Sequence, residues 1–160
     1  DQMIDMRAVL RHLRDDAESL SSDHHKITFD ADEGLTVTGV ETEILSALGN
    51  LVTNAIRYTP DGGAIKVSWQ AQAGAAVFSV TDSGLGIPAA DIPRLTERFY
   101  RVDRSRSRDT GGTGLGLAIV KHVLQRHDAQ LDVKSEEGRG STFTVRFPVY
   151  RTTRRQPAHA

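Results

Sequence analysis

Hydrophobic and polar positions follow one another with two different periods along the chain. Residues 6–21 and 41–58 carry apolar side chains at the three- and four-residue spacing of an amphipathic helix. The apolar stripes are Met6, Val9, Leu10, Leu13, Ala17 and Leu20 in the first segment and Ile44, Leu48, Leu51 and Ala55 in the second. Asp5 is placed to cap the first helix. A third helix is predicted over about residues 115–126.

Shorter segments alternate with a period of two, which predicts β-strands. These segments are 26–30, 35–38, 64–71, 75–81, 131–135 and 142–147. Pro88 is expected to open a short helix that reaches Glu97. Helices that alternate with paired strands favour an α+β fold, a two-layer sandwich with the helices on one face of a mixed β-sheet.

Composition narrows the class of protein. The chain has 160 residues, enough for one domain with a sizeable core, and no apolar run approaches the length of a membrane span. It has no cysteine, which excludes disulfides, thiolate nucleophiles and cysteine-type zinc sites. We expect one domain over residues 1–150 and a disordered basic tail over residues 151–160.

Charge is distributed unevenly although the net charge is only -1. Residues 1–33 carry nine acidic and four basic side chains, whereas residues 94–108 carry six arginines and two acidic side chains. A local arginine cluster in a near-neutral protein points to a small polyanion such as nucleotide phosphates. Nucleic acid as a partner is disfavoured, because it would favour a basic face across the whole domain.

Two asparagines stand on the second predicted helix. Asn50 and Asn54 are four residues apart and therefore share a face. Asparagine is a poor choice inside a helix, and its neutral amide oxygen can bind Mg²⁺ beside phosphates. Two solvated polar positions would give the same pattern, so the pair alone leaves both interpretations open.

Two glycine motifs follow. Asp82, Gly84 and Gly86 come directly after a predicted strand, where Asp82 could accept a hydrogen bond from an exocyclic amine, although an ordinary tight turn has the same pattern. Alternating glycines at 112–116 open the third helix, where backbone amides and the helix dipole favour phosphate. The six histidines show no ligand or catalytic spacing and are interpreted as structural or solvated.

The order of these motifs resembles the ATP-binding catalytic domain of sensor histidine kinases, a family grouped with the ATPases of DNA gyrase and Hsp90. Residues 50–59, 82–87 and 112–117 resemble its N, G1 and G2 boxes, 95–103 its F box, and 137–143 its last glycine box. The F box has Thr96 where many members have Phe, and it keeps Phe99. Residues 26–29, 95–108 and 117–122 resemble the phosphate-regulon members in particular, which implies a role in phosphate-starvation signalling.

The resemblance implies a role for each matching residue. It makes Asn54 the main Mg²⁺ ligand with Asn50 beside it, and it makes Asn50, Asn54 and Arg101 the catalytic set. The implied ATP-binding residues are Asn54, Arg57, Tyr58, Asp82, Gly84, Gly86, Ile87, Arg101, Gly112, Thr113, Gly114, Leu115, Gly116 and Leu117. Residues 100–113 would form a lid over ATP.

The resemblance also implies what lies elsewhere in the parent protein. None of the six histidines has the family's acceptor context, so the phosphorylated histidine is expected on a separate helical dimerisation domain, with residues 1–5 as the end of its linker. A response regulator would be the partner of the full-length kinase. The domain itself would lie in the cytoplasm, without membrane contact, as part of an inner-membrane-anchored sensor.

Two other functions compete with phosphotransfer. A hydrolysing ATPase of the gyrase and Hsp90 type has a catalytic glutamate where this chain has Asn50, and asparagine is no general base at neutral pH. A nucleotide-sensing module without catalysis is the third interpretation, and the presence of Arg101 and of the asparagine helix argues against it.

Overall fold

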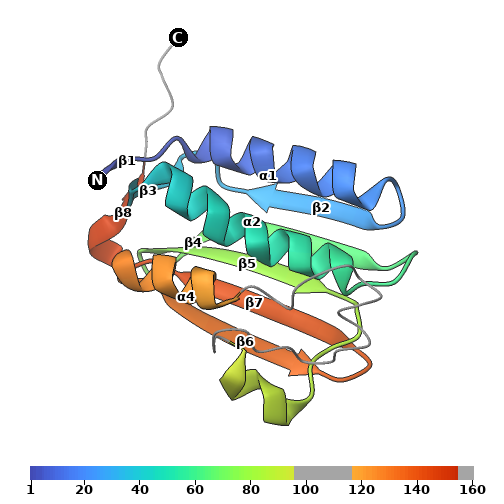
Figure 1. Cartoon of the computed structure of the whole chain (residues 1–160). Coiled ribbons are helices and arrows are strands. Elements are labelled where there is room, and N and C mark those ends of the chain that lie inside the picture. Colours follow the sequence, from blue (N-terminus) through green and yellow to red (C-terminus); the bar gives the residue numbers. More distant parts are fainter. Residues whose placement is uncertain (96–116, 155–160) are drawn as a thin grey trace.

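The computed structural model describes residues 1–95 and 117–154. Within these residues three α-helices lie on one face of a five-stranded sheet (Figure 1). The helices are α1 (Met6–Ser21), α2 (Glu41–Arg57) and α4 (Leu117–Arg126). The predicted α+β sandwich is therefore confirmed.

The sheet is mixed, as predicted. In spatial order its strands are β2 (Lys26–Ala31), β4 (Ala64–Gln72), β5 (Ala75–Asp82), β7 (Gly140–Arg146) and β6 (Gln130–Glu136). The pair β2 and β4 is parallel, and the other pairs are antiparallel. Because β5 lies in the middle of the sheet, its carboxyl end at Asp82 is flanked by β4 and β7.

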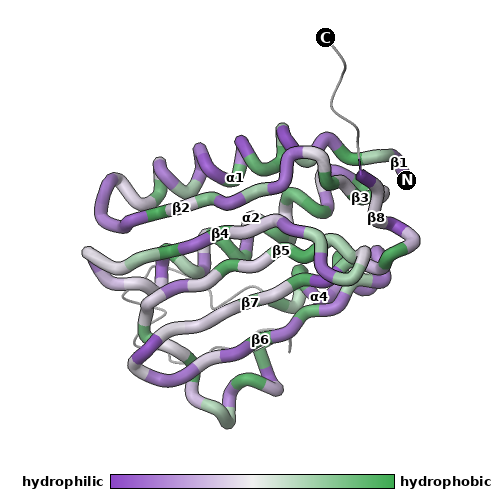
Figure 2. Tube along the Cα trace, turned by 180° about the vertical axis from the view of Figure 1, so that it is seen from behind, coloured by the Kyte–Doolittle hydropathy of each residue, from purple (hydrophilic) through white to green (hydrophobic). Residues whose placement is uncertain are grey.

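The core fills the space between the helices and the sheet. Ile65, Val67 and Trp69 alternate along β4 and are fully buried, as the period of two predicts. The rings of Trp69 and Phe147 pack edge to face, with their centroids 5.9 Å apart. Nε1 of Trp69 donates to the carbonyl of Leu35 at 2.9 Å. Figure 2 shows hydrophilic positions recurring along α1 between the hydrophobic ones.

One position of the α1 stripe is wrong. Leu20 is 43% exposed, whereas Ser21 is buried in its place. The helical period itself favours Leu20, which lies only about 20° from the direction of Leu13. Ser21 is buried because it packs against His25, whose Nδ1 lies 2.9 Å from its Oγ and whose amide donates to this oxygen at 3.1 Å. At the other end of α1 the carboxylate of Asp5 accepts from the amide of Ala8 at 3.2 Å, which confirms the predicted cap.

A second, three-stranded sheet stands beside the termini, and the sequence pattern does not predict it. It consists of β1 (Gln2–Met3), β3 (Leu35–Gly39) and β8 (Thr152–Arg154), preceded by the 3-10 turn η2 (Val149–Arg151). The prediction of a disordered tail from residue 151 is thus wrong for residues 151–154, because β8 pairs with β3 and Arg154 binds Asp32 at 2.8 Å. Residues 155–160 lie outside the described part of the chain.

The segment after Pro88 forms a 3-10 helix, η1 (Ala89–Arg94), where a short helix is predicted. Glu97, the predicted end of that helix, lies outside the described residues. Pro93 inside η1 lacks an amide proton, which disfavours a longer regular helix. None of the helices in the described ranges combines the length and the apolar character needed to cross a membrane.

Candidate functional site

The end of α2 and the end of β5 meet at one place. The amide of Leu85, just after β5, donates to the carbonyl of Tyr58, just after α2, at 3.1 Å. The turn after β5 is also tied to the start of β4, because the amide of Ser83 donates to the carbonyl of Ala64 at 3.0 Å. The structure therefore brings together Tyr58, Asp82 and the glycine motif that follows it, as the sequence predicts for one site.

Asp82 is the buried acid of this site, with 8% of its surface exposed. Burial raises the pKa of its carboxyl group to about 6, although hydrogen bonds from the backbone amides of Gly84 and Ser141 lower it in part. The amide of Gly84 lies 2.9 Å from Oδ1. At neutral pH the group is mostly ionised, so it acts as an acceptor for a further donor such as an exocyclic amine.

Two glycines let the loop after Asp82 pack tightly. A Cβ at Gly84 would lie 2.8 Å from Oδ1 of Asp82 and would run into the carbonyl of Tyr58. Gly86 has a φ of +72°, and a Cβ there would run into the carbonyl of Glu136. The amide of Ile87 then donates to Oγ of Ser135 at 2.7 Å. The loop is thus fixed between α2 and the β6–β7 turn.

Thr59 adds a polar group that sequence reasoning missed. Its side chain is buried, and its Oγ1 has no hydrogen-bond partner among the described residues. A Cβ at Gly84 would lie 2.8 Å from this oxygen, as it would from Oδ1 of Asp82. A buried hydroxyl without a partner is costly, so a ligand or water that satisfies it is favoured at this site. The sequence marks it only as the last residue of the segment 50–59 that resembles the N box, directly after Tyr58.

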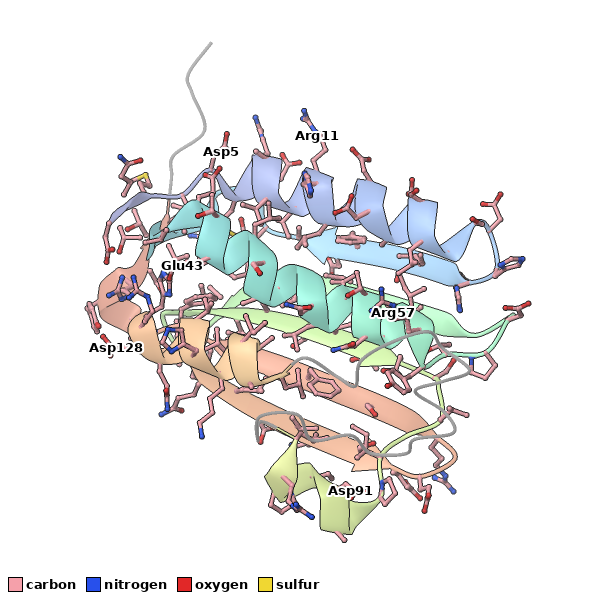
Figure 3. All side chains as sticks on the ribbon, in the orientation of Figure 1. Asp5, Arg11, Glu43, Arg57, Asp91 and Asp128 are labelled. Atoms are coloured by element: carbon pink, nitrogen blue, oxygen red, sulfur yellow. The ribbon has the colours of Figure 1, made fainter. Side chains whose placement is uncertain are left out.

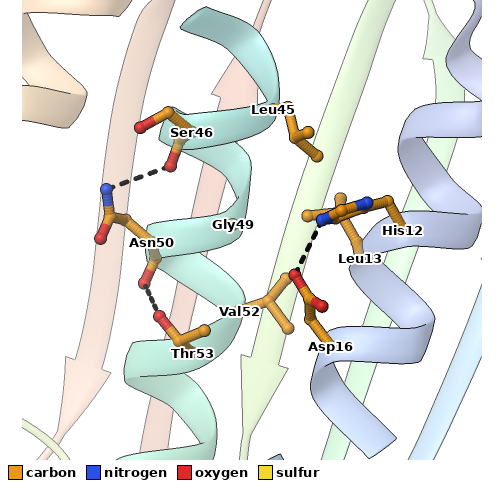
Figure 4. Close-up of a pocket in the computed structure, with 9 residues that line it drawn as sticks. All are labelled: His12, Leu13, Asp16, Leu45, Ser46, Gly49, Asn50, Val52 and Thr53. Atoms are coloured by element: carbon orange, nitrogen blue, oxygen red, sulfur yellow. Dashed lines mark hydrogen bonds and ion pairs between the residues drawn. The ribbon is translucent and has the colours of Figure 1, made fainter. Parts of the chain in front are cut away.

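The two asparagines of α2 lie in different surroundings. Asn54 is buried, whereas Asn50 is half-exposed and its Nδ2 donates to the carbonyl of Ser46 at 3.0 Å. Figure 4 shows Asn50 at a pocket between α1 and α2, and on the α1 side of this pocket Nε2 of His12 lies 3.1 Å from a carboxylate oxygen of Asp16. The prediction that both asparagines serve one metal ion stays a prediction.

The remaining predicted residues divide between described and undescribed parts. Arg57 ends α2 with its side chain exposed (Figure 3), Ile87 is buried, and Leu117 is buried at the start of α4. The residues outside the described ranges are Arg101, Gly112, Thr113, Gly114, Leu115 and Gly116, together with Thr96, Phe99 and the predicted lid at 100–113.

The donor set suits a metal ion that arrives with its ligand. Residues 1–95 and 117–154 contain no group of three His, Asp or Glu side chains that could hold a metal. Mg²⁺ commonly binds through one or two protein oxygens together with substrate phosphates and water. The amide oxygens on α2 fit that role, and a cage made by the protein alone is not required.

Two histidines have structural partners, in line with their interpretation from sequence. His127 is 2% exposed, its Nδ1 donates to the carbonyl of Val123 at 2.7 Å, and its Nε2 accepts from the amide of Val40 at 3.0 Å. His25 lies between Ser21 and the carbonyl of Thr59. One backbone partner of each ring, Val40 for His127 and Thr59 for His25, is distant in sequence, so the pattern could not have named it.

Comparison with known proteins gives a consistent result. The family model described as "Histidine kinase-, DNA gyrase B-, and HSP90-like ATPase" matches residues 39–151. The phosphate regulon sensor protein PhoR of Pseudomonas aeruginosa is 53% identical over 141 residues, which are 88% of this chain. The same match covers 32% of PhoR, so this chain spans about a third of the length of that relative.

Solved structures agree with the sequence matches. The mycobacterial sensor histidine kinase MprB superimposes with a TM-score of 0.81 at 28% identity, over 92% of this chain and 97% of that one. Full-length ShkA in complex with AMPPNP superimposes with a TM-score of 0.76 at 26% identity, over 91% of this chain and 30% of ShkA.

Proposed function

The chain belongs to the family of histidine kinase-, DNA gyrase B- and HSP90-like ATPases, and we propose that it binds Mg·ATP and passes the γ-phosphoryl group to a histidine on a separate domain. Within the family it is the catalytic ATPase domain of a sensor histidine kinase. This chain matches only about a third of the length of its relative PhoR. The activity and the partners of a whole sensor kinase are therefore part of the proposal.

The buried carboxylate of Asp82 is the observation that carries the proposal. Burial raises the pKa of this carboxyl group to about 6, and carboxyl groups with raised pKa values are concentrated at functional sites. Here the acid stands next to the unpartnered hydroxyl of Thr59 and behind a glycine loop with no room for side chains. These groups fit a ligand edge that offers a hydrogen-bond donor, such as the exocyclic amine of adenine.

Each residue then has a limited task. Asp82 accepts from the adenine amine, Tyr58 lines the base or ribose, and Arg57 reaches the phosphates. Asn54, with Asn50 beside it, would hold the Mg²⁺ ion, which neutralises phosphate charge when bound. Arg101 and the glycines at 112–116 would contact the phosphates. Phosphoryl transfer needs little covalent help, so positioning and charge neutralisation would supply most of the catalysis.

The proposal includes the place of this domain in a larger sensor. Residues 1–150 would be the catalytic domain, with residues 1–5 as the end of a linker from a helical dimerisation domain that carries the acceptor histidine. A response regulator would receive the phosphoryl group. The resemblance to phosphate-regulon kinases supports phosphate-starvation signalling by a membrane-anchored sensor whose catalytic domain lies in the cytoplasm.

Hydrolysis by a general base is not favoured. Asn50 stands where hydrolysing relatives have a glutamate, and its amide nitrogen is bonded to the carbonyl of Ser46 on its own helix. An amide cannot take a proton from water at neutral pH. We therefore expect at most slow release of phosphate by the isolated domain.

The test is incubation with γ-labelled ATP. The isolated chain is expected to bind Mg·ATP without labelling itself, because none of its histidines has the acceptor context. Addition of the helical histidine domain of the P. aeruginosa relative, 53% identical in its catalytic part, should produce acid-labile label on that domain. Labelling should be slow, since the two domains are no longer tethered.

Asn54→Ala is the matched variant, and it should remove the label because the metal loses a protein ligand. Stoichiometric acid-labile label on the isolated chain would contradict the acceptor assignment. Rapid phosphate release without an acceptor would favour the hydrolysing alternative.

A further inference from the structure

The imidazole of His25 connects the end of α1 to the end of α2. Its Nδ1 lies 2.9 Å from Oγ of Ser21, and its Nε2 lies 2.6 Å from the carbonyl oxygen of Thr59. A carbonyl oxygen only accepts, so Nε2 carries the proton and donates. The backbone amide of His25 also donates to Oγ of Ser21 at 3.1 Å. Ser21 is buried, so this end of the bridge is anchored in the core.

The other end of the bridge is the chain turn that lines the candidate nucleotide site. The carbonyl of Tyr58 accepts from Leu85 of the glycine loop, and the carbonyl of the next residue, Thr59, accepts from His25. Tyr58 and Thr59 are therefore held from two sides, by the loop after Asp82 and by the imidazole. The side chain of Thr59 lies against Gly84, next to Asp82.

We infer that His25 is a positioning residue of the nucleotide site, acting through Thr59 and Tyr58 without touching the ligand. The inference rests on the proposed function, since it deepens the role of the same site. The sequence predicts a structural or solvated histidine, and His25 indeed has structural partners. Its hydrogen bond to Thr59 additionally connects it to the nucleotide site. Backbone hydrogen bonds between the two loops support the connection, from Gly62 to the carbonyl of His24 and from Lys26 to that of Gly63.

Two substitutions separate the two ends of the bridge. In His25→Gln the side-chain amide reaches as far as Nε2 and can still donate to Thr59. In His25→Asn the amide reaches only as far as Nδ1, so the contact with Ser21 is kept and the donor to Thr59 is lost. Both variants lose the ring, so a purely structural role of the imidazole would affect them alike.

The measurement is the Kd of the isolated chain for Mg·ATP by calorimetry, with thermal unfolding measured in parallel. His25→Asn is expected to weaken binding about tenfold, which equals about 1.4 kcal/mol. His25→Gln should bind close to wild type. His24→Ala is the control, because that neighbouring side chain is exposed and only its backbone is bonded.

A readout without ligand completes the test. Hydrogen exchange at the amide of Leu85, which donates to Tyr58, should be faster in His25→Asn than in His25→Gln. Equal affinities and equal exchange in the two variants would overturn the inference, even if both are less stable than wild type. If the wild-type chain does not bind Mg·ATP at all, the proposed function fails instead, and the exchange experiment still decides whether His25 holds the turn.

Discussion

The two ends of α2 bury polar groups in opposite ways. At its start, His127 uses both ring nitrogens on the backbone of Val123 and Val40, so every polar group of the imidazole is satisfied. At its end, burial raises the pKa of Asp82 to about 6, and Oγ1 of Thr59 has no partner within the described residues. The first arrangement stabilises the fold, whereas the second has hydrogen-bonding capacity that a ligand can use.

This difference distinguishes structural from functional polar groups packed around the two ends of one helix. A buried group that is fully paired needs nothing more, and its removal leaves a hole and orphaned partners. A buried acid that remains partly unsatisfied destabilises the free protein, which is typical of sites that bind or react. Substitution at the start should therefore change stability and leave affinity unchanged, while substitution at the end should do the reverse.

The largest expected effect is at the start of α2. His127→Ala removes a fully buried ring and leaves the amide of Val40 without its acceptor. By analogy with the truncation of other buried rings, we expect a loss of about 3–5 kcal/mol of unfolding free energy. Urea unfolding measures it, and the exposed His122→Ala on α4 is the control. A loss below that of the control would contradict the structural role assigned to the ring.

Asp82→Asn tests the other end. The substitution removes the buried charge and keeps an oxygen that can accept from Gly84, so unfolding free energy should stay constant or rise. Affinity for Mg·ATP should fall by about 1–3 kcal/mol or more, because the adenine amine loses a charged acceptor. Calorimetry with ATP measures this loss. Wild-type affinity in the variant would remove Asp82 from the site.

Much of this contrast is readable in the sequence, but not all of it. The glycines at 84 and 86 mark the site because only small residues fit there, and the period of the apolar residues predicts the helices and a mixed sheet. The pattern also predicts β3 as a strand, but not that β3 belongs to the second sheet. His127 binds the amide of Val40, 87 residues away, and His25 binds the carbonyl of Thr59, 34 residues away, and no local pattern encodes these contacts. The short strand β8 escaped prediction for the same reason, since its pairing with β3 is long-range.

Asn50 and Asn54 show a finer limit. A spacing of four residues places them on one face, yet four helical steps overshoot a full turn by about 40°. That rotation moves Asn54 into the interior and leaves Asn50 beside the α1–α2 pocket. The spacing therefore predicts neighbouring side chains, while their burial depends on the packing of α1 and the sheet.

The pH dependence sharpens the comparison further. The ionised carboxylate of Asp82 accepts a hydrogen bond from the adenine amine. Nucleotide affinity should therefore reach its maximum well above pH 6 and fall about tenfold for each pH unit below it. Stability should move in the opposite direction. Because the folded pKa is above the ordinary value of 3.8, the stability contributed by Asp82 is complete below pH 3.8 and is lost as the pH rises through about 6.

Calorimetric titrations between pH 5 and 8 measure the affinity. Asp82→Asn is the control, because protonation of the nucleotide itself affects both proteins equally. When the pH profile of affinity of Asp82→Asn is subtracted from that of the wild type, the remaining pH dependence is due to Asp82. Parallel profiles in the two proteins would contradict the assignment of Asp82 to the nucleotide site.

The smallest expected effect returns to the start of α2. Arg126 at the end of α4 binds Glu43 in the first turn of α2 through two contacts, Nε to Oε1 at 2.9 Å and Nη2 to Oε2 at 3.2 Å. The carboxylate of Glu43 also interacts favourably with the positive, N-terminal end of the dipole of α2. The pair is partly exposed, so Glu43→Gln should lower the unfolding free energy by only about 0.5–1 kcal/mol, and less at high salt. Urea unfolding at two salt concentrations measures both effects.

Affinity for Mg·ATP should not change in Glu43→Gln, because the ion pair lies at the start of α2, where the polar contacts stabilise the fold and do not line the nucleotide site. A weakened affinity in Glu43→Gln, at a stability loss this small, would show that the two ends are coupled through the helix and that their division of roles is incomplete.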